Sequence, residues 1–226
     1  MDTYNSTISF WDSIFGNVQP KYYDGENQIH KDLETAIKWL SNRSKSILDY
    51  GCGSGAMLFR GASYDNIDKC LGVDISLNAV ELGNATAKLN NLENVVNFIC
   101  GGVETLKAID DNSFDSIILS NIIDNIIKQD ANIVINNAHR ILKTNGKLLV
   151  KLNPYLTEEE LKESGSKLIE DNLYIDSDGI YLWNLNTTQW KEFLEEFFII
   201  EEYKEIYFEQ FNQYNRLFLI TNKENS

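Results

Sequence analysis

The chain has 226 residues, of which 43% are hydrophobic and 24% are charged, as in a globular protein. This length suits one sizeable α/β domain and is too short for two domains of ordinary size, so residues 1–226 are expected to form a single domain. No apolar run approaches the roughly 18 residues that a membrane span needs, and the first residues lack a basic segment followed by an apolar core. We therefore expect a cytoplasmic protein with no membrane partner.

Charge and cysteine content narrow the expected partners further. The net charge of −14 would repel DNA or RNA, and the basic residues are scattered along the chain, which argues against nucleic acid as a partner. Cys52, Cys70 and Cys100 show no C-x-x-C spacing, which predicts reduced thiols and no metal site. The sequence leaves the oligomeric state open.

The first 43 residues precede any predicted strand. Residues 10–15 are predicted to form a short helix and residues 17–24 a loop. Residues 26–42 should be an amphipathic helix, because apolar residues recur there with a period of about 3.6. His30 lies one place from that apolar stripe, so it is either a base near a pocket mouth or a packed or solvent-facing histidine.

A strand, a tight turn and a helix start are predicted over residues 46–58. Asp49 closes a short apolar run, and three glycines then stand at alternate positions, Gly51, Gly53 and Gly55. Glycine lets a turn adopt positive φ and lets backbone N–H groups approach a ligand, and the helix start adds unpaired N–H groups of its own. The turn therefore predicts a binding site for a nucleotide-like ligand.

Two protein classes use such a turn. Gly51-x-Gly53-x-x-Ala56 fits the loose dinucleotide fingerprint, and Asp74 follows at the roughly 20-residue spacing of a ribose-binding acid, which keeps an NAD-dependent oxidoreductase as an alternative. The longer phrase over residues 48–55 is more specific, and it resembles motif I of class I S-adenosylmethionine-dependent methyltransferases. Residues 114–121 resemble motif IV of that family, and residues 139–150 resemble the helix, turn and fifth strand that follow it.

The resemblance covers about residues 46–151 and implies an α/β fold, a doubly wound, mainly parallel seven-stranded sheet with the last strand antiparallel. It implies S-adenosyl-L-methionine as the cofactor, with the glycine turn beside its methionine part, Asp74 on the ribose hydroxyls and the end of the fourth strand facing the transferable methyl group. The residues expected to bind the cofactor are Asp49, Gly51, Cys52, Gly53, Asp74, Ile75, Val103, Glu104, Ser120 and Asn121.

The sequence departs from the family pattern in two places. Gly102 occupies a position where an acid often contacts adenine, so that contact falls to the Val103 backbone or to Glu104. At the end of the fourth strand, residues 120–123 lack the Asn-Pro-Pro-Tyr signature of amino-directed nucleic-acid methyltransferases. Residues 153–155 look like that signature but follow the fifth strand, so they are interpreted as a strand-terminating loop.

Several further elements are predicted from pattern. Residues 95–100 should be a buried parallel strand, and residues 122–142 a helix with a break near Gln129 and Asp130. Residues 154–186 should be an insert near the substrate pocket that contains a hairpin turning at Asp178-Gly179. The two final strands, 198–203 and 216–221, should pair antiparallel, as in the methyltransferase sheet.

Aromatic residues outside the sheet have two interpretations. In the resembling family the N-terminal segment often folds over the cofactor, so residues 1–43 are expected to act as a cap. Trp11, Tyr22 and Tyr23 would then line the pocket or merely anchor the cap to the core. Tyr181 and Trp183 in the insert would likewise form a pocket wall or pin the insert in place.

The sequence shows no strongly placed general base, so no catalytic residue is named. An acceptor of low acidity would need help from His30, Tyr22 or Tyr155. The leading hypothesis is an S-adenosylmethionine-dependent methyltransferase acting on a small-molecule acceptor. The alternatives are an NAD-dependent oxidoreductase and a methyltransferase-like domain that binds cofactor or a partner protein without catalysis.

Overall fold

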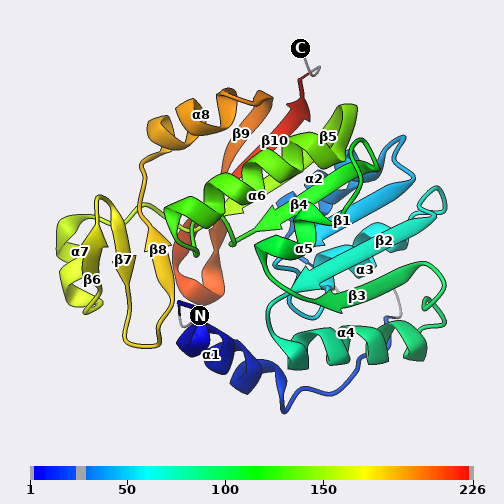
Figure 1. Ribbon diagram of the computed structural model, residues 1–226, viewed down its shortest axis with the longest axis horizontal. Helices are drawn as coiled ribbons and strands as arrows, with labels where there is room; N and C mark the ends of the chain where they lie inside the picture. The colour runs from blue at the N-terminus through cyan, green and yellow to red at the C-terminus, as the bar shows by residue number, and fades with distance from the viewer. Residues whose placement is uncertain (1–2, 24–28, 224–226) are drawn as a thin grey trace.

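The computed structural model describes residues 3–23 and 29–223, and its centre is a seven-stranded sheet in the order β3-β2-β1-β4-β5-β10-β9 (Figure 1). The first five strands pair in parallel and β10 runs antiparallel to both of its neighbours, so the predicted Rossmann-like methyltransferase sheet is confirmed. The strands are β1 (Ser46–Tyr50), β2 (Lys69–Asp74), β3 (Val96–Cys100), β4 (Phe114–Ser120), β5 (Leu142–Leu152), β9 (Phe198–Phe208) and β10 (Gln213–Asn222).

Helices cover both faces of this sheet. One face packs against α5 (Val103–Lys107), α6 (Lys128–Ile141) and α8 (Thr187–Glu195), and the other against α2 (Lys31–Ser41), α3 (Ala56–Ala62) and α4 (Leu77–Leu89). All five residues of β1 are buried, with Leu48 in one of the two hydrophobic clusters and Ile47 in the other. Such two-sided burial is typical of parallel strands that are covered by helices on both faces.

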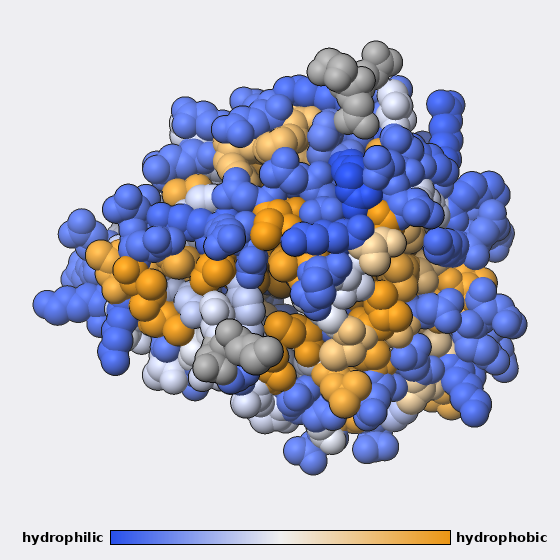
Figure 2. All heavy atoms as spheres, viewed as in Figure 1, coloured by the Kyte–Doolittle hydropathy of each residue, from blue (hydrophilic) through white to orange (hydrophobic). Residues whose placement is uncertain are grey.

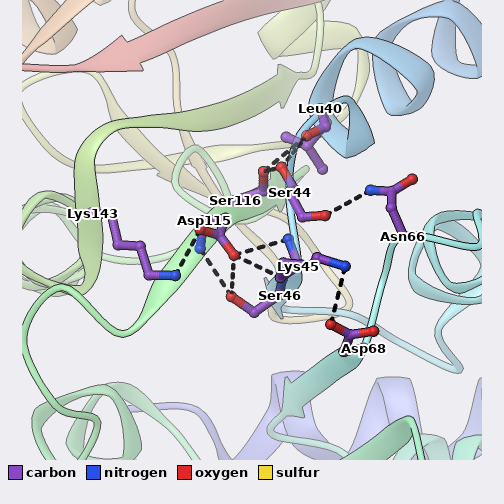
Figure 3. Close-up of polar contacts among 9 residues, drawn as sticks. All are labelled: Leu40, Ser44, Lys45, Ser46, Asn66, Asp68, Asp115, Ser116 and Lys143. Carbon is purple, nitrogen blue, oxygen red and sulfur yellow. Dashed lines mark hydrogen bonds and ion pairs between the residues drawn. The ribbon is translucent and has the colours of Figure 1, made fainter.

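A polar cluster joins the amino ends of β1 and β4 (Figure 3). One carboxylate oxygen of Asp115 accepts hydrogen bonds from the Lys45 N–H at 2.9 Å, the Ser46 N–H at 3.0 Å and the Ser46 hydroxyl at 2.9 Å. The other oxygen accepts from Lys143 Nζ at 2.7 Å. Burial acts to raise the pKa of Asp115, but these donors outweigh it and hold the pKa below its usual value. The cluster fixes the ends of the strands opposite the predicted ligand site.

The third strand lies at an edge of the sheet, so the prediction of a buried strand at 95–100 is wrong in its burial and right in its parallel pairing. Val96 and Phe98 are buried, whereas Asn97, Ile99 and Cys100 are exposed. The side chain of Asn84 on α4 covers the open side of β3, because its Oδ1 accepts from the Phe98 N–H and its Nδ2 donates to the Phe98 carbonyl, both at 3.2 Å. The edge therefore has its backbone groups satisfied at this residue.

The predicted helix over 122–142 begins later than expected. Helix α6 starts at Lys128, and the preceding residues form an irregular loop that begins with Asn121 at φ 54°. Asp124 holds this loop: its carboxylate accepts from the Asn153 N–H at 2.7 Å, and its carbonyl accepts from the Trp183 N–H at 2.7 Å. Buried isoleucines in this loop recur at a spacing like that of a helix, which is why the pattern predicted one. Tertiary contacts hold the segment as a loop instead.

The C-terminal third adds two hairpins. Strands β9 and β10 pair antiparallel as predicted, and they extend toward each other until only a short 3-10 turn, Glu209–Phe211, separates them. A small second sheet contains β6 (Lys167–Glu170), β7 (Leu173–Ile175) and β8 (Tyr181–Trp183), which confirms the predicted hairpin, and α7 (Glu158–Glu163) precedes it. Across residues 3–23 and 29–223, every helix is too short or too polar to cross a membrane.

The N-terminal segment lies against the carboxyl ends of the central strands. Helix α1 (Asn5–Phe15) is longer than predicted and packs beside α4 (Figure 1). Helix α2 begins at Lys31; the predicted helix start at 26–28 and the last residue of the predicted loop lie outside the described residues.

Candidate functional site

A cavity of about 830 Å³ opens at the carboxyl ends of β1, β2, β4 and β5, between α1 and the tip of the β9–β10 hairpin. In Figure 2 its mouth is the hollow near the middle of the face, with apolar side chains around it. Eight of the ten residues expected to bind the cofactor line this cavity, namely Gly51, Gly53, Asp74, Ile75, Val103, Glu104, Ser120 and Asn121. Asp49 and Cys52 do not line it, and the cofactor-binding role of each of the ten stays a prediction.

The glycine turn owes its shape to positive φ angles and close neighbours. Gly51 has φ 73°, and a Cβ there would lie 2.8 Å from Cγ1 of Ile122. Gly55 has φ 86°, and a Cβ there would lie 2.4 Å from Cζ of Phe98. The Gly51 N–H donates to the Val73 carbonyl at 2.8 Å and the Gly53 N–H to Asp74 Oδ2 at 2.7 Å. These two N–H groups are already bonded within the protein, so at these positions the turn offers a ligand close approach and not free donors.

Asp74 stands at the end of β2, where it joins the turn to the next helix. Its Oδ2 accepts from Gly53 and its Oδ1 accepts from the Ser76 N–H at 2.9 Å. Burial raises the pKa of Asp74, while the N–H groups of Ser76 and Gly53 act in the opposite direction. The carboxylate is thus held in one orientation on the cavity wall, as a ribose-binding acid would need to be.

Asp49 lies behind the turn, 2% exposed, and its Oδ1 has no hydrogen-bond partner. Burial and the nearby charge of Asp74 raise the pKa of Asp49 to about 8. An unpaired buried carboxyl oxygen is costly in a folded protein, and Asp49 carries that cost behind the turn, outside the cavity lining. Asp74 and Glu104, which do line the cavity, supply carboxylate acceptors of the kind that ribose hydroxyls and an adenine amine would need.

Glu104 occupies the space that an acid at position 102 would use. Its Oε1 accepts from the Gly102 N–H at 2.9 Å, and its Oε2 lies 2.9 Å from the point where a Cβ on Gly102 would stand. Because Glu104 also lines the cavity, a carboxylate is present at this wall even though position 102 is glycine.

Helix α1 forms part of the cavity roof and is tied down at both ends. Asp12 Oδ1 accepts from the Ser76 hydroxyl at 2.6 Å, and at the other end the Tyr4 hydroxyl donates to Asp130 Oδ2 at 2.7 Å. Trp11 lines the cavity, which agrees with the pocket-lining role that was one of its two predicted roles. Tyr23 instead stacks on Phe59 with ring centres 5.0 Å apart.

The remaining aromatic and basic candidates lie away from the cavity lining. His30 caps α2 and packs on Phe208, with ring centres 4.9 Å apart. Trp183 is buried against Trp190 and Tyr181 packs on Tyr4, so both pin the insert to the rest of the chain. Tyr22 and Tyr155 are exposed.

The structure brings together a second group of cavity residues, of which the sequence reasoning named only Asn121 and missed Asn125, Lys151 and Asn153. Lys151 Nζ donates to Asn121 Oδ1, Asn121 Nδ2 donates to Asn153 Oδ1 at 2.5 Å, and Asn153 Nδ2 donates to Asn125 Oδ1 at 2.7 Å. We call Asn121, Asn125 and Asn153 the amide row; all three line the cavity together with Lys151. The position of Lys151 and Asn153 at the carboxyl end of the fifth strand was the signal that could have found them. Within the described ranges, no group of three or more His, Cys, Asp or Glu side chains is placed to hold a metal ion.

Fold and site together define a methyltransferase of the Rossmann-like class. The family model described as "Methyltransferase domain" matches residues 41–202, so the chain belongs to the methyltransferase domain family and is an S-adenosylmethionine-dependent methyltransferase by class. Among solved structures, the N-methyltransferase NodS from Bradyrhizobium japonicum, in complex with S-adenosylhomocysteine, superposes with a TM-score of 0.69 at 14% identity, covering 97% of this chain and 100% of that one. Methyl transfer therefore replaces the oxidoreductase alternative.

Two curated relatives cover most of the chain. The tRNA N(3)-methylcytidine methyltransferase trm140 of Schizosaccharomyces pombe is 24% identical over 80% of this chain and 60% of its own length. The tRNA N(3)-methylcytidine methyltransferase Mettl2 of Drosophila melanogaster is 22% identical over 77% of this chain and 56% of its own length. The chain thus matches less than two thirds of either relative.

These relatives overturn the expectation of a small-molecule acceptor and the expectation that nucleic acid is no partner, since both relatives are named for action on tRNA. The physical reason lies in what net charge measures. A total of −14 is a sum over the whole chain and does not fix the potential at any one part of the surface. The missing Asn-Pro-Pro-Tyr signature likewise excludes one set of nucleic-acid methyltransferases and not the others.

Proposed function

We propose that this chain transfers a methyl group from S-adenosyl-L-methionine to a nucleobase nitrogen of tRNA, with N3 of cytidine as the first candidate. The observation that carries the proposal is the likeness to two tRNA N(3)-methylcytidine methyltransferases over about four fifths of the chain. The chain spans roughly 60% of those relatives, so the activity, the substrate and any partner are inferred for this domain from its own cavity.

One end of the cavity suits the cofactor. Asp74 would bind the ribose hydroxyls, and Glu104 and the Val103 backbone would lie at the adenine. The glycine turn would lie beside the methionine part, with Asp49 buried behind it. Charge-assisted hydrogen bonds of this kind contribute about 1.5 to 3 kcal/mol each. When bound, the cofactor supplies an already activated sulfonium methyl group. The protein then has to orient the acceptor and exclude water.

The other end suits a base taken out of a nucleic-acid stack. Enzymes that act on a base hold it between aromatic or apolar side chains and read its edge with hydrogen bonds. Here Phe208 and Phe211 supply aromatic surface, and the amide row supplies donors and acceptors. The row lies next to Ser120 at the end of β4, so its amides would meet the base near the point of transfer.

The test is methyl transfer to defined RNA. The full chain is incubated with tritiated S-adenosylmethionine and unmodified tRNA transcripts, and the RNA is then digested to nucleosides and analysed by mass spectrometry. We expect label in RNA, in 3-methylcytidine, and none when Asp74→Ala replaces the wild type. Asp65→Ala, at an exposed site outside the cavity, is the matched control and should methylate normally.

Two results would count against the proposal. Label in protein when ribosomal or release-factor substrates are offered, with none in RNA, would assign a protein acceptor. Label in a different nucleoside would keep tRNA as the substrate and remove cytidine N3.

A further inference from the structure

Lys151 places an amino group at the end of the cavity that contains the amide row, which we call the acceptor end. It is the penultimate residue of β5 and lies opposite Ser120 of β4 in the parallel ladder. Its carbonyl accepts from the Asn121 N–H at 2.7 Å, which fixes the backbone beside the end of β4. Its Nζ donates to Asn121 Oδ1 and lies 5.4 Å from the centre of the Phe208 ring. The amino group is thus positioned from two sides.

The lysine also sets the direction of the amide row. A lysine side chain presents only donors when charged, so Asn121 must turn its oxygen toward Nζ and its Nδ2 toward Asn153. Asn153 then turns its Nδ2 toward Asn125, which leaves Asn125 Nδ2 as the last donor of the row. A neutral Nζ keeps an N–H for Asn121 and gains one lone pair. The same geometry therefore holds a proton acceptor in the cavity.

The surroundings of Lys151 favour the neutral form. Burial lowers the pKa of Lys151 to about 8, and the carboxylate of Asp124 opposes that shift. Asp124 lies in the loop after β4 and also interacts electrostatically with Arg216 on β10. The positive charge of Arg216 therefore offsets part of the effect of the Asp124 carboxylate on Lys151. The other charged groups that line the cavity are Asp74, Glu104 and Asp130. Of these, Asp74 and Glu104 accept from backbone N–H groups at the cofactor end, and Asp130 accepts from Tyr4.

We propose that the neutral amine of Lys151 is the general base of the reaction and removes a proton from the exocyclic amine of the acceptor base. This step rests on the proposed function. The ring nitrogen of the base forms the new N–CH3 bond with its lone pair, while the S–CH3 bond breaks and its electrons pass to sulfur. The exocyclic amine loses a proton to Lys151 Nζ, and its N–H electron pair becomes the second bond of a C=N group. The methylated base leaves the step neutral and Lys151 leaves it charged.

The first test titrates the lysine without any reaction. The full chain, labelled with 13C at lysine Cε, is followed by NMR from pH 6 to 11, and the Lys151 signal is identified by its loss in Lys151→Arg. A midpoint near pH 8 is expected. A midpoint above about 10, the ordinary value for lysine, overturns the proposal whether or not the chain is active.

The second test follows turnover with RNA. In the wild type, kcat should rise with pH and level off above about 8. Lys151→Arg keeps a positive charge and hydrogen-bond donors but cannot lose its proton, so its kcat should fall by about 100-fold and lose the pH dependence. Lys151→Ala should fall similarly and recover in part when a small primary amine is added. Binding of S-adenosylhomocysteine should stay within about threefold of wild type in both variants.

Lys147→Met is the matched control on the same strand. Lys147 lies in the middle of β5, outside the cavity lining, and its Nζ donates to the Trp39 and Asn42 carbonyls at 2.6 Å. Its substitution should therefore leave kcat and the pH profile unchanged. If the wild type methylates RNA and Lys151→Arg is equally fast, the base role is overturned and the proposed function stands. If the wild type methylates no RNA, the proposed function fails and this step fails with it, because it has no acceptor.

Discussion

The two ends of the cavity are built from different kinds of contact. At the cofactor end, Gly53 in the turn after β1 and Asp74 at the end of β2 are 21 residues apart. At the acceptor end, Lys151 bonds to a residue 30 positions earlier, Arg216 holds Asn153 from 63 positions away, and Tyr4 reaches Asp130 across 126 positions. Local sequence thus specifies the cofactor end, whereas the acceptor end exists only when the whole sheet has assembled.

The largest effect is expected from removing the acid at the cofactor end. Asp74→Ala should weaken S-adenosylhomocysteine binding by at least about 100-fold, because two charge-assisted hydrogen bonds to the ribose would be lost. Isothermal titration calorimetry measures the change. Asp68→Ala, at the exposed start of the same strand region, serves as control. Equal affinity of Asp74→Ala and wild type would mean that the ribose binds elsewhere. The assignment of the cofactor to this end of the cavity would then be wrong.

Asp49 gives the cofactor end a distinct response to pH. Its folded-state pKa is raised to about 8, so its ionisation destabilises the folded chain progressively as the pH rises from about 4 to about 8. Asp49→Asn should remove this fall, making the variant more stable than wild type by at least about 2 kcal/mol at pH 8.5, with a much smaller difference at pH 5. Urea unfolding at the two pH values measures it. The exposed Asp65→Asn should follow the wild type; a constant offset between Asp49→Asn and wild type would show that Asp49 titrates normally.

A change in the amide row should separate acceptor use from cofactor binding. Asn153→Ala breaks the row at its middle and leaves the Asn121 and Asn125 side chains without their partner. We expect kcat/KM for RNA to fall by about 10-fold, equivalent to one hydrogen bond, with unchanged calorimetric affinity for S-adenosylhomocysteine. Asn136→Ala, on the exposed side of α6, is the matched control. Loss of cofactor affinity in Asn153→Ala would mean that the two ends are coupled.

The smallest effect is expected at the opposite ends of the strands. Asp115→Asn should lower stability by about 1 kcal/mol at pH 7, since it loses a charge-assisted bond to Lys143. The pKa of Asp115 is lowered in the fold, so this contribution is present above the unfolded-state pKa and is lost as the pH falls through the folded-state value. Urea unfolding at pH 7 and pH 3 measures both points. Altered binding of S-adenosylhomocysteine would contradict the confinement of ligand contacts to the carboxyl ends.

The sequence predicted that the glycine turn and Asp74 would lie together because they come from neighbouring segments of the chain; that they bind the cofactor stays a prediction. Three alternate glycines and Asp74 are a pattern that sterics and hydrogen bonding confine to few structures, and the structure places Gly51, Gly53 and Asp74 on one cavity wall. The mainly parallel seven-stranded sheet with an antiparallel last strand followed from the same resemblance. Asp49 and Cys52 fell outside the cavity lining; Asp49 is a buried residue of β1, behind the turn.

The acceptor end could not be predicted in the same way. Asn121 takes a left-handed conformation, at φ 54°, that lets the chain leave β4 as a loop, and asparagine tolerates this conformation better than most residues. The partners of that loop come from β5 and β8, which no periodicity near residue 121 reveals. The net charge of −14, a sum over the whole chain, pointed to the wrong class of acceptor because it does not describe the local surface that an acceptor meets.

The side-chain amide of Asn84, which bonds from α4 to the edge strand β3, also affects how this sheet can contact other chains. A row of free backbone donors and acceptors at a sheet border invites a strand from another molecule to add itself. An intruding strand would have to displace Asn84 from both backbone groups of Phe98 before it could pair there. The Asn84 side chain thus protects this edge strand against pairing with another chain. Proteins commonly use a proline, a bulge or an inward-pointing charge for the same purpose.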